Sequence, residues 1–415
     1  MQLKEAIVKR HVAALALTIA AAPAAAQLGL PPLGPSVGGV LDSATRQLDP
    51  VLQTVDGITG EALRRVRARA SRLADLVRRN PDAIELDSER NPARRGELLL
   101  VGPDEADVAA ATAAGYAVLG RERLDNLDVT VIRVAVPGNT PLRDAEAALR
   151  RLLPNAKITA DALHFQSGAA QRPAAATQGA IPTAAINVPV GIIDGAPGPA
   201  VRVAGVRGFA NGAPVSSAHG SAVASLLQLA GVRQIRVADV YGTDAAGGGA
   251  LAVVRGLDWL VGAGNRVISI SLVGPNNLLV AKAVAAAQRR GVTIVAAVGN
   301  DGPAAPPSFP ASYPGVIAVT AVDGRNRPLI EAGRALHLDY AAPGADLLAV
   351  NRDGRWSPVR GTSYAAPFVA ARAAAAIGHG DPIAVLDREA IDLGRKGADP
   401  VFGRGLLCQS CPVRK

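Results

Sequence analysis

The stretch that decides the fold runs from residue 267 to residue 298 and reads VISISLVGPNNLLVAKAVAAAQRRGVTIVAAV. It contains an apolar run (267–272), a segment with helical periodicity (278–290) and a second apolar run (292–298). Apolar runs without alternation, joined by helices, indicate parallel strands buried on both faces of a sheet. The same pattern recurs nearby, with runs at 188–193, 237–241 and 316–322 and a helical segment at 250–263. We therefore predict an α/β domain with a doubly wound, mainly parallel sheet, whose chemistry sits at the carboxyl ends of the strands.

The segment before this domain has the pattern of a small α+β unit. Helices are predicted at 104–114 and from Thr140 onward, where Thr140 and Pro141 form a suitable N-cap and first-turn pair. Strands are predicted at 97–101, 129–136 and 157–165. We predict the order βαββαβ, which is ferredoxin-like and has one strand more than the three placed here. Residues 167–182, rich in Ala, Gln, Gly and Pro, are then expected to form an exposed linker.

The first 26 residues have the pattern of a targeting segment. Basic residues at positions 4, 9 and 10 precede an apolar stretch (12–22) that ends in an Ala-x-Ala sequence. This predicts a cleavable secretory signal peptide and a secreted or periplasmic protein; the alternative is an uncleaved anchor helix. A Pro/Gly-rich stretch at 28–39 is expected to be a linker.

A second feature of the N-terminal region is an amphipathic helix with seven arginines between Arg64 and Arg79. Its apolar stripe consists of Leu63, Val66, Ala70, Leu73 and Val77. Such a helix could contact an anionic membrane surface or a partner protein. The alternative, which we favour, is an ordinary solvated helix packed on its own domain.

Composition excludes several classes of protein. Apolar residues make up 49% of the 415 residues and charged residues 19%, which excludes wholesale disorder and a coiled-coil rod. Beyond the first few dozen positions no run of eighteen uncharged apolar residues occurs, which excludes a polytopic membrane protein. The net charge of +9 is spread out and aromatic residues are only 3%, so nucleic-acid binding has little support.

Four residues stand where chemistry could occur. Asp194 follows an apolar run, His219 begins an apolar helical segment, and Ser363 begins an alanine-rich helix extending to about residue 377. Asn300 lies between glycines after the run 292–298. Taken singly, each of these residues is more often a helix cap or a turn former.

Their order and local contexts make the set specific, because Asp194, His219, Asn300 and Ser363 in this order resemble the subtilisin-like serine peptidases, the subtilases. The serine motif GTSYAAPFVA and the histidine motif, His219-Gly220-Ser221 with Val223-Ala224, carry most of the likeness. Further matching segments are 268–272, 297–302, 310–319 and 341–344. The resemblance covers about residues 186–407.

The resemblance implies a role for each of these residues. His219 would take the Ser363 proton while Asp194 holds the imidazole. The Asn300 amide and the Ser363 N–H would form the oxyanion hole. An extended peptide substrate would pair with the segment formed by Ser271, Leu272, Val273 and Gly274, and the other wall of the primary specificity pocket would be Ala297, Val298 and Gly299.

The patterns above and the resemblance together give a domain layout. It comprises a signal peptide (1–26), a linker and Arg-rich helical region (27–95), a propeptide-like βαββαβ domain (96–166), a linker with the autoprocessing site (167–182), a catalytic domain (183–407) and a CxxC tail (408–415). Secreted subtilases often carry such a propeptide, which assists folding and inhibits by laying its C-terminal tail in the cleft. We therefore expect self-cleavage within residues 164–182.

Some positions depart from the family pattern. Gly195 and Ala196 follow Asp194, where Thr or Ser and then Gly are usual, which leaves the local support of Asp194 open. Val273 stands where glycine is common, and we expect it to narrow the cleft and favour small or medium apolar residues before the cleaved bond. No Asp-rich loop of calcium-site type occurs, so no metal or cofactor is predicted and calcium rests on family analogy alone.

Two cysteines, Cys408 and Cys411, are too few for a structural zinc site without other ligands. We expect a local disulfide, with reduced or intermolecular cysteines as alternatives.

Two functions remain in competition. The first is a secreted serine endopeptidase, made as a precursor that its own N-terminal domain inhibits and acting on polypeptide substrates. The second is a catalytically silent scaffold that binds peptides or a partner protein. A lipase of the α/β-hydrolase type is excluded because Gly-x-Ser-x-Gly is absent and the chain order of the triad differs.

Overall fold

The computed structural model describes residues 58–167, 169–170, 178–179, 184–409, 411 and 413–414. The predicted signal peptide and the 28–39 linker lie outside the described residues, as does most of the 167–182 linker. Within the described ranges, no helix combines the length and the apolar character needed to cross a bilayer.

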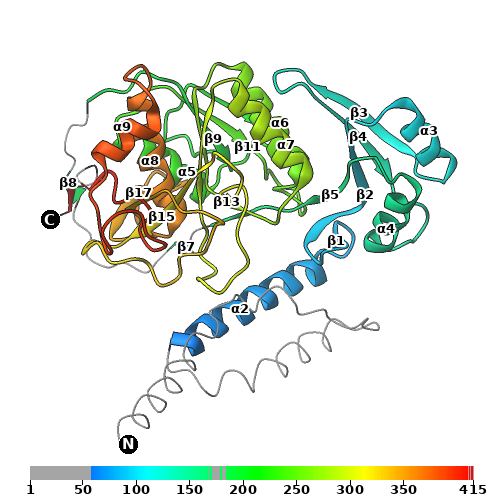
Figure 1. Ribbon diagram of the computed structural model, residues 1–415, viewed down its shortest axis with the longest axis horizontal. Helices are drawn as coiled ribbons and strands as arrows, with labels where there is room; N and C mark the ends of the chain where they lie inside the picture. Colours follow the sequence, from blue (N-terminus) through cyan, green and yellow to red (C-terminus); the bar gives the residue numbers. More distant parts are fainter. Residues whose placement is uncertain are drawn as a thin grey trace, which may run out of the picture. The chain divides into compact units, whose positions relative to one another are not determined.

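A five-stranded antiparallel sheet with two helices forms the N-terminal domain (Figure 1). The strands β2, β4 and β3 are neighbours in that order, β5 pairs with the free side of β2, and β1 adds a short extra strand. Without β1 this is the ferredoxin-like arrangement predicted from the βαββαβ order. The elements are β1 (Ile84–Leu86), β2 (Pro92–Val101), α3 (Glu105–Ala113), β3 (Val118–Leu124), β4 (Val129–Ala135), α4 (Leu142–Leu152) and β5 (Ile158–Ala162).

The N-terminal domain differs from the expected boundaries in three places. Its sheet begins at Ile84 rather than at residue 96. Hydrophobic patterning misses β1 because it has only three residues, and it misses the first half of β2 because that half is polar. The predicted strand 157–165 ends at Ala162, where the chain crosses to the next domain. Thr140 does not cap α4: Pro141 holds the cap position, and the Glu85 carboxylate accepts from the Leu142 N–H at 3.1 Å.

Seven parallel strands form the sheet of the second domain, as the apolar runs predicted. Their order is β10 (Gly205–Gly208), β11 (Ile235–Asp239), β9 (Val190–Asp194), β12 (Val267–Ile270), β14 (Thr293–Ala297), β15 (Ile317–Val322) and β16 (Tyr340–Pro343). The edge strands β10 and β16 were not predicted. The first is short and partly exposed, and the second, YAAP, has a single large side chain.

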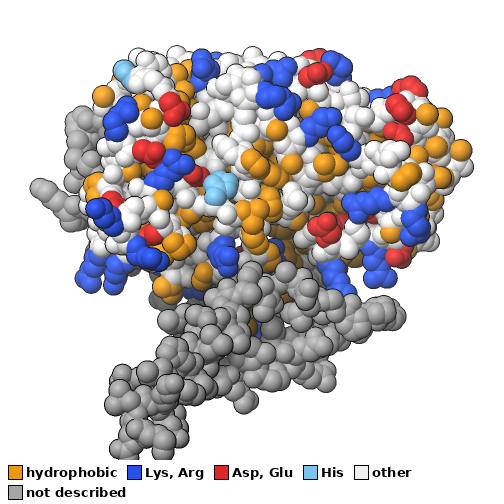
Figure 2. All heavy atoms as spheres, in the orientation of Figure 1, with side chains coloured by type: hydrophobic (Ala, Val, Ile, Leu, Met, Phe, Trp, Pro, Cys, Tyr) orange, Lys and Arg blue, Asp and Glu red, His pale blue; other side chains and the backbone are white. Residues whose placement is uncertain are grey.

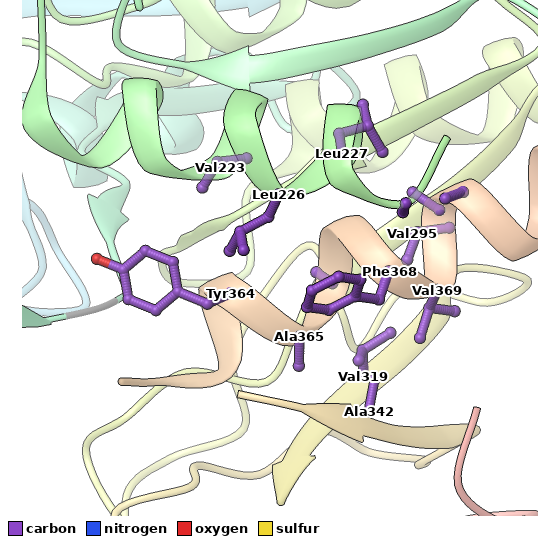
Figure 3. Packing of buried hydrophobic residues seen from close by; sticks show 14 of the residues in the cluster. Val223, Leu226, Leu227, Val295, Val319, Ala342, Tyr364, Ala365, Phe368 and Val369 are labelled. Carbon is purple, nitrogen blue, oxygen red and sulfur yellow. The ribbon is translucent and has the colours of Figure 1, made fainter. Parts of the chain in front are cut away.

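Helices cover both faces of this sheet, so its side chains are buried on both sides. On one face, α5 (Ala218–Leu229) and α8 (Thr362–Ala376) form a hydrophobic core with the strands. Figure 3 shows Leu226 of α5 and Phe368 of α8 lying close together, near Val295 and Val319 of the sheet. On the other face lie α6 (Ala250–Gly262) and α7 (Leu278–Arg289).

The N-terminal sheet packs on α6 and α7 of the second domain. Alternate residues of β2 point to opposite faces: Leu98 and Leu100 join the core under α3 and α4, whereas Leu99 and Val101 join the core of α6 and α7. The Asp161 carboxylate accepts from the Leu251 N–H at 2.9 Å, in the first turn of α6. The last strand of the N-terminal domain is thereby attached to the second domain just before residue 163.

Outside these two sheets and their helices, the structure also has α2 (Ile58–Arg79), α9 (Pro382–Glu389), a hairpin of β17 (Leu347–Val350) and β18 (Trp356–Arg360), and several two-residue strands described below. Two arginines of α2 contact the second domain: Arg69 Nε lies 3.0 Å and an Arg72 guanidinium nitrogen 2.5 Å from the Asp301 carboxylate. Elsewhere, Lys and Arg side chains are scattered among acidic and apolar ones over the face shown in Figure 2.

Candidate active site

Asp194 and His219 are buried and lie within hydrogen-bond distance of each other, at the edge of the sheet where the parallel strands have their carboxyl ends. Asp194 is the last residue of β9 and His219 the second residue of α5. His219 Nδ1 lies 2.8 Å from Asp194 Oδ2 and 3.0 Å from Oδ1. Gly220 permits this approach, since a Cβ there would lie 1.9 Å from the Gly195 carbonyl oxygen. The carboxylate therefore fixes the imidazole so that Nε2 faces away from it.

Ser363 and Asn300 converge on the same edge from two other elements. Ser363 is the second residue of α8, after Gly361, whose φ of 140° suits glycine. The Thr362 N–H donates to Asn300 Oδ1 at 3.0 Å, and the Gly299 N–H donates to Thr362 Oγ1 at 3.0 Å. These bonds orient the Asn300 amide, leaving its Nδ2 free to donate toward the space in front of Ser363.

That space holds the chain's own residues 165–167. The short strand β6 (Phe165–Gln166) pairs antiparallel with β13 (Leu272–Val273), so Gln166 is opposite Leu272 and Phe165 opposite Val273. The Ser167 N–H donates to the Ser271 carbonyl at 3.3 Å. Beyond the site, β7 (Ala169–Ala170) pairs with β18. The predicted peptide-binding segment thus binds a peptide, and Ser167, expected in an exposed linker, is buried.

The carbonyl oxygen of Ser167 lies between the two predicted oxyanion donors. It accepts from Asn300 Nδ2 at 2.5 Å and from the Ser363 N–H at 3.3 Å. Donors in these positions stabilise the negative charge that develops on a carbonyl oxygen under nucleophilic attack. The Ser167 carbonyl therefore lies at the position where two such donors would act.

The Ser363 hydroxyl makes no hydrogen bond to His219 Nε2 in the described structure. Ser363 Oγ lies 2.6 Å from Ser167 Oγ and 3.4 Å from the Ser271 carbonyl oxygen. His219 Nε2 is buried and has no hydrogen-bond partner among the described residues. The ring of Tyr364 lies 5.4 Å from the His219 ring, which keeps the start of α8 beside the imidazole. The Asp194–His219 pair and the oxyanion donors are thus assembled, while the nucleophile is bonded to the bound segment.

The predicted specificity pocket is only partly lined by the predicted side chains. Gly299, with φ of 89°, lies against Val273, whose Cγ1 is 3.0 Å from the position that a Cβ of Gly299 would take. Ala297 and Val298 instead contribute their side chains to the two hydrophobic cores, as Leu272 does. Val273 therefore occupies space between the two walls. Gly274 lies beside the His164 ring, which its Cβ would meet at 2.4 Å.

One functional contact was missed from the sequence. Gln166 Nε2 donates to Asp194 Oδ1 at 2.9 Å and lies 3.3 Å from Ser217 Oγ. No local pattern marks Gln166, but the missing side chain at Gly195, next to Asp194, was a signal that another group supports the carboxylate.

Burial sets the protonation of two rings near the site. Desolvation lowers the pKa of His164 to about 4, so this histidine is neutral at pH 7. Burial and the nearby Asp194 charge raise the pKa of Tyr364, which stays a neutral phenol. Both groups are therefore uncharged at neutral pH.

The described residues contain no cluster of three or more His, Cys, Asp or Glu side chains that could hold a metal ion. Cys408 and Cys411 form a disulfide close to the C-terminus, distant in sequence from the residues of the site. The short strands β8 (Gln178–Gly179) and β19 (Val413–Arg414) pair beyond it.

Comparison with known proteins identifies the family that this chain resembles. A family model described as "Subtilase family" matches residues 203–386. Subtilisin DY of Bacillus licheniformis is 32% identical over 207 residues, which are 45% of this chain and 76% of that protein. The minor extracellular protease Epr of Bacillus subtilis is 30% identical over 177 residues, which are 40% of this chain and 27% of Epr. The chain spans 55% of the length of another relative, subtilisin E of Bacillus subtilis, at 31% identity over 208 residues that are 45% of this chain.

Solved structures share the fold over a longer part of the chain. Fervidolysin from Fervidobacterium pennivorans, a keratinolytic enzyme related to subtilisin, matches with a TM-score of 0.62 and 17% identity. That match covers 77% of this chain and 61% of fervidolysin. The epidermin leader peptide processing serine protease of Staphylococcus aureus matches with a TM-score of 0.57 and 16% identity, over 75% of this chain and 96% of that one.

Proposed function

Since this chain belongs to the subtilase family, we propose that it is a serine endopeptidase, made as a precursor that cleaves itself after Ser167. One observation carries the proposal: the Ser167 carbonyl oxygen accepts hydrogen bonds from both Asn300 Nδ2 and the Ser363 N–H. A peptide carbonyl held by two such donors next to a helix-terminal serine is the arrangement that acyl transfer requires.

In the proposed reaction Ser363 Oγ first turns from Ser167 Oγ to His219 Nε2. The oxygen attacks the Ser167 carbonyl carbon while His219 takes its proton, and Asp194 stabilises the imidazolium that forms. The oxyanion is held by Asn300 and the Ser363 N–H. His219 then gives the proton to the departing nitrogen of Gly168 as the peptide bond breaks, and water hydrolyses the acyl-enzyme.

The N-terminal domain would remain bound after this cleavage and inhibit the enzyme. The strand β6, which pairs with β13, precedes the cleaved bond and so stays covalently attached to the N-terminal domain. The same is true of Asp161, which bonds to α6. Arg255 reinforces these contacts by pairing with Glu122 at 2.6 Å. The N-terminal targeting pattern supports a secreted or periplasmic enzyme.

The experiment is intact mass and N-terminal sequencing of the full chain beside two variants. The unaltered chain should yield a new N-terminus at Gly168, and Ser363→Ala should stay uncleaved. Ser269→Ala is the matched control, because Ser269 is also buried but its hydroxyl has no hydrogen-bond partner in the described part of the chain. It should cleave like the unaltered protein.

A silent peptide-binding scaffold is the second candidate, and the absence of a hydrogen bond between Ser363 and His219 in the described structure favours it. A fluorophosphonate separates the two, since it reacts with an activated serine only. If the unaltered chain stays intact and Ser363 remains unlabelled, the endopeptidase proposal is wrong.

A further inference from the structure

We propose that the active site selects glutamine at the residue before the one whose carbonyl enters the oxyanion hole, and that Gly195 and Ser217 create this preference. The inference rests on the proposed function, because it concerns the substrates of the same site. It goes beyond self-cleavage, since it assigns a specificity pocket for substrates in general.

The pocket is defined by the contacts of Gln166. Its carboxamide Nε2 donates to Asp194 Oδ1 at 2.9 Å and is 3.3 Å from Ser217 Oγ. Asp194 is fully buried, and Ser217 is the N-cap of α5, whose hydroxyl also accepts from the Gly220 N–H at 3.2 Å. A substrate side chain therefore reaches the buried carboxylate that orients the imidazole.

The absence of a side chain at position 195 makes this reach possible. A Cβ on Gly195 would lie 2.6 Å from Ser217 Cβ, 2.9 Å from Ser217 Oγ and 3.4 Å from Gln166 Nε2. The φ of Gly195 is outside the left-handed region, so the backbone does not require glycine. Space is the physical reason for glycine here: a side chain would collide with Ser217 and crowd the carboxamide.

The chemistry of the pocket calls for a neutral donor of glutamine's length. Asp194 Oδ1 already accepts from the Gly195 N–H at 2.7 Å and lies 3.0 Å from His219 Nδ1, and the carboxamide adds a third donor to this buried oxygen. Glutamate would place a second carboxylate beside Asp194, and methionine has the length without the donor. A hydrogen bond to a buried charged group is worth roughly tenfold to a hundredfold in rate when it is kept in the transition state.

The test uses the enzyme released from the full chain and three peptides that copy residues 164–170, His-Phe-X-Ser-Gly-Ala-Ala, with X as Gln, Met or Glu. At pH 8 we expect kcat/KM for Gln to exceed that for Met by at least about tenfold, with Glu slowest. Cleavage of the Gln and Met peptides at equal rates would overturn the inference while leaving the peptidase intact. If none is cleaved and a fluorophosphonate leaves Ser363 unlabelled, the proposed function itself fails.

A double variant checks the two pocket residues directly. Gly195→Ser with Ser217→Gly places a hydroxyl beside Asp194 and removes the side chain that it would strike. We expect the ratio of kcat/KM for the Gln and Met peptides to fall toward one, whatever the absolute rate. An unchanged ratio would show that these residues do not create the preference. The peptide series with the unaltered enzyme decides the main question if this variant does not fold.

Discussion

The hydroxyl oxygens of Ser167 and Ser363 lie 2.6 Å apart, so the residue after which we propose cleavage is hydrogen-bonded to the proposed nucleophile. While this bond exists, Ser363 Oγ is turned to Ser167 and His219 Nε2 is without a hydrogen-bond partner in the described structure. In the proposed reaction, the bound segment thus places its carbonyl oxygen between the oxyanion donors and at the same time holds the Ser363 hydroxyl away from His219.

Removing the Ser167 hydroxyl should speed self-cleavage. In Ser167→Ala the Ser363 hydroxyl loses the hydrogen bond that competes with His219. A neutral hydrogen bond contributes about 0.5–1.5 kcal/mol, so the rate of self-cleavage should rise by roughly twofold to tenfold. Appearance of the Gly168 N-terminus over time, measured by mass spectrometry, checks this. Ser167→Thr keeps the hydroxyl and serves as the control. Slower cleavage of Ser167→Ala would contradict this account of the contact.

Acid should weaken binding of residues 164–167 in the cleft. Burial lowers the pKa of His164 from its ordinary 6.5 to about 4, and its Nε2 has no partner within the described residues. The released state therefore binds a proton more readily than the bound state. The contribution of neutral His164 to the free energy of binding is complete above pH 6.5 and is lost as the pH falls toward 4. At pH 5 binding should be weaker by up to about 2 kcal/mol.

The measurement for this prediction is release of the N-terminal fragment from the cleaved complex, followed by size-exclusion chromatography between pH 7 and pH 4.5. In His164→Phe, release of the N-terminal fragment should depend less on pH, because the phenylalanine ring does not titrate. Other groups also titrate in this range, such as Asp161, because burial raises its pKa. Their effect is the same in both proteins, so the difference between the two reports His164. Equal pH dependence in the two proteins would exclude His164 as the cause.

The contact between Arg69 and Asp301 should hold α2 against the second domain. Asp301→Ala removes the partner of both Arg69 and Arg72, so we expect faster hydrogen exchange along α2. The free energy of unfolding should change by less than about 1 kcal/mol, because the pair is partly exposed. Arg79→Ala is the control, since Arg79 Nε donates within its own helix to the Asp75 carbonyl. Unchanged exchange in Asp301→Ala would refute the anchoring role.

Val273 should limit the size of the residue before the cleaved bond. Its Cγ1 lies against Gly299 between the two walls of the pocket, and Ser167, the residue bound there, is small. The unaltered enzyme should therefore cleave after Ser or Ala faster than after Phe. Val273→Gly should raise kcat/KM for Phe peptides by roughly tenfold or more relative to Ser peptides. A preference of the unaltered enzyme for Phe or Lys would refute the hypothesis.

Much of the second domain could be predicted from local sequence. Five of its seven parallel strands are continuous apolar runs, and such runs indicate burial on both faces whatever their partners are. The candidate residues Asp194, His219 and Ser363 stand at ends of predicted strands or starts of helices, and in a parallel sheet those positions converge at one edge. Local patterning therefore predicted the architecture, whereas the choice of these residues as a candidate site came from the resemblance to the subtilases.

The resemblance implied that the tail of an N-terminal domain lies in the site, but only the tertiary structure decided which residues lie there and what they contact. The strands β6 and β13 have two residues each and lie about a hundred positions apart, so no periodicity predicts their pairing. Gln166 reaches Asp194 only because the chain turns away from the N-terminal sheet after Ala162 and enters the cleft. Ser363 bonds to Ser167 rather than to His219 for the same reason. These contacts depend on how the two domains meet, and hydrophobic patterning within either domain carries no information about that meeting.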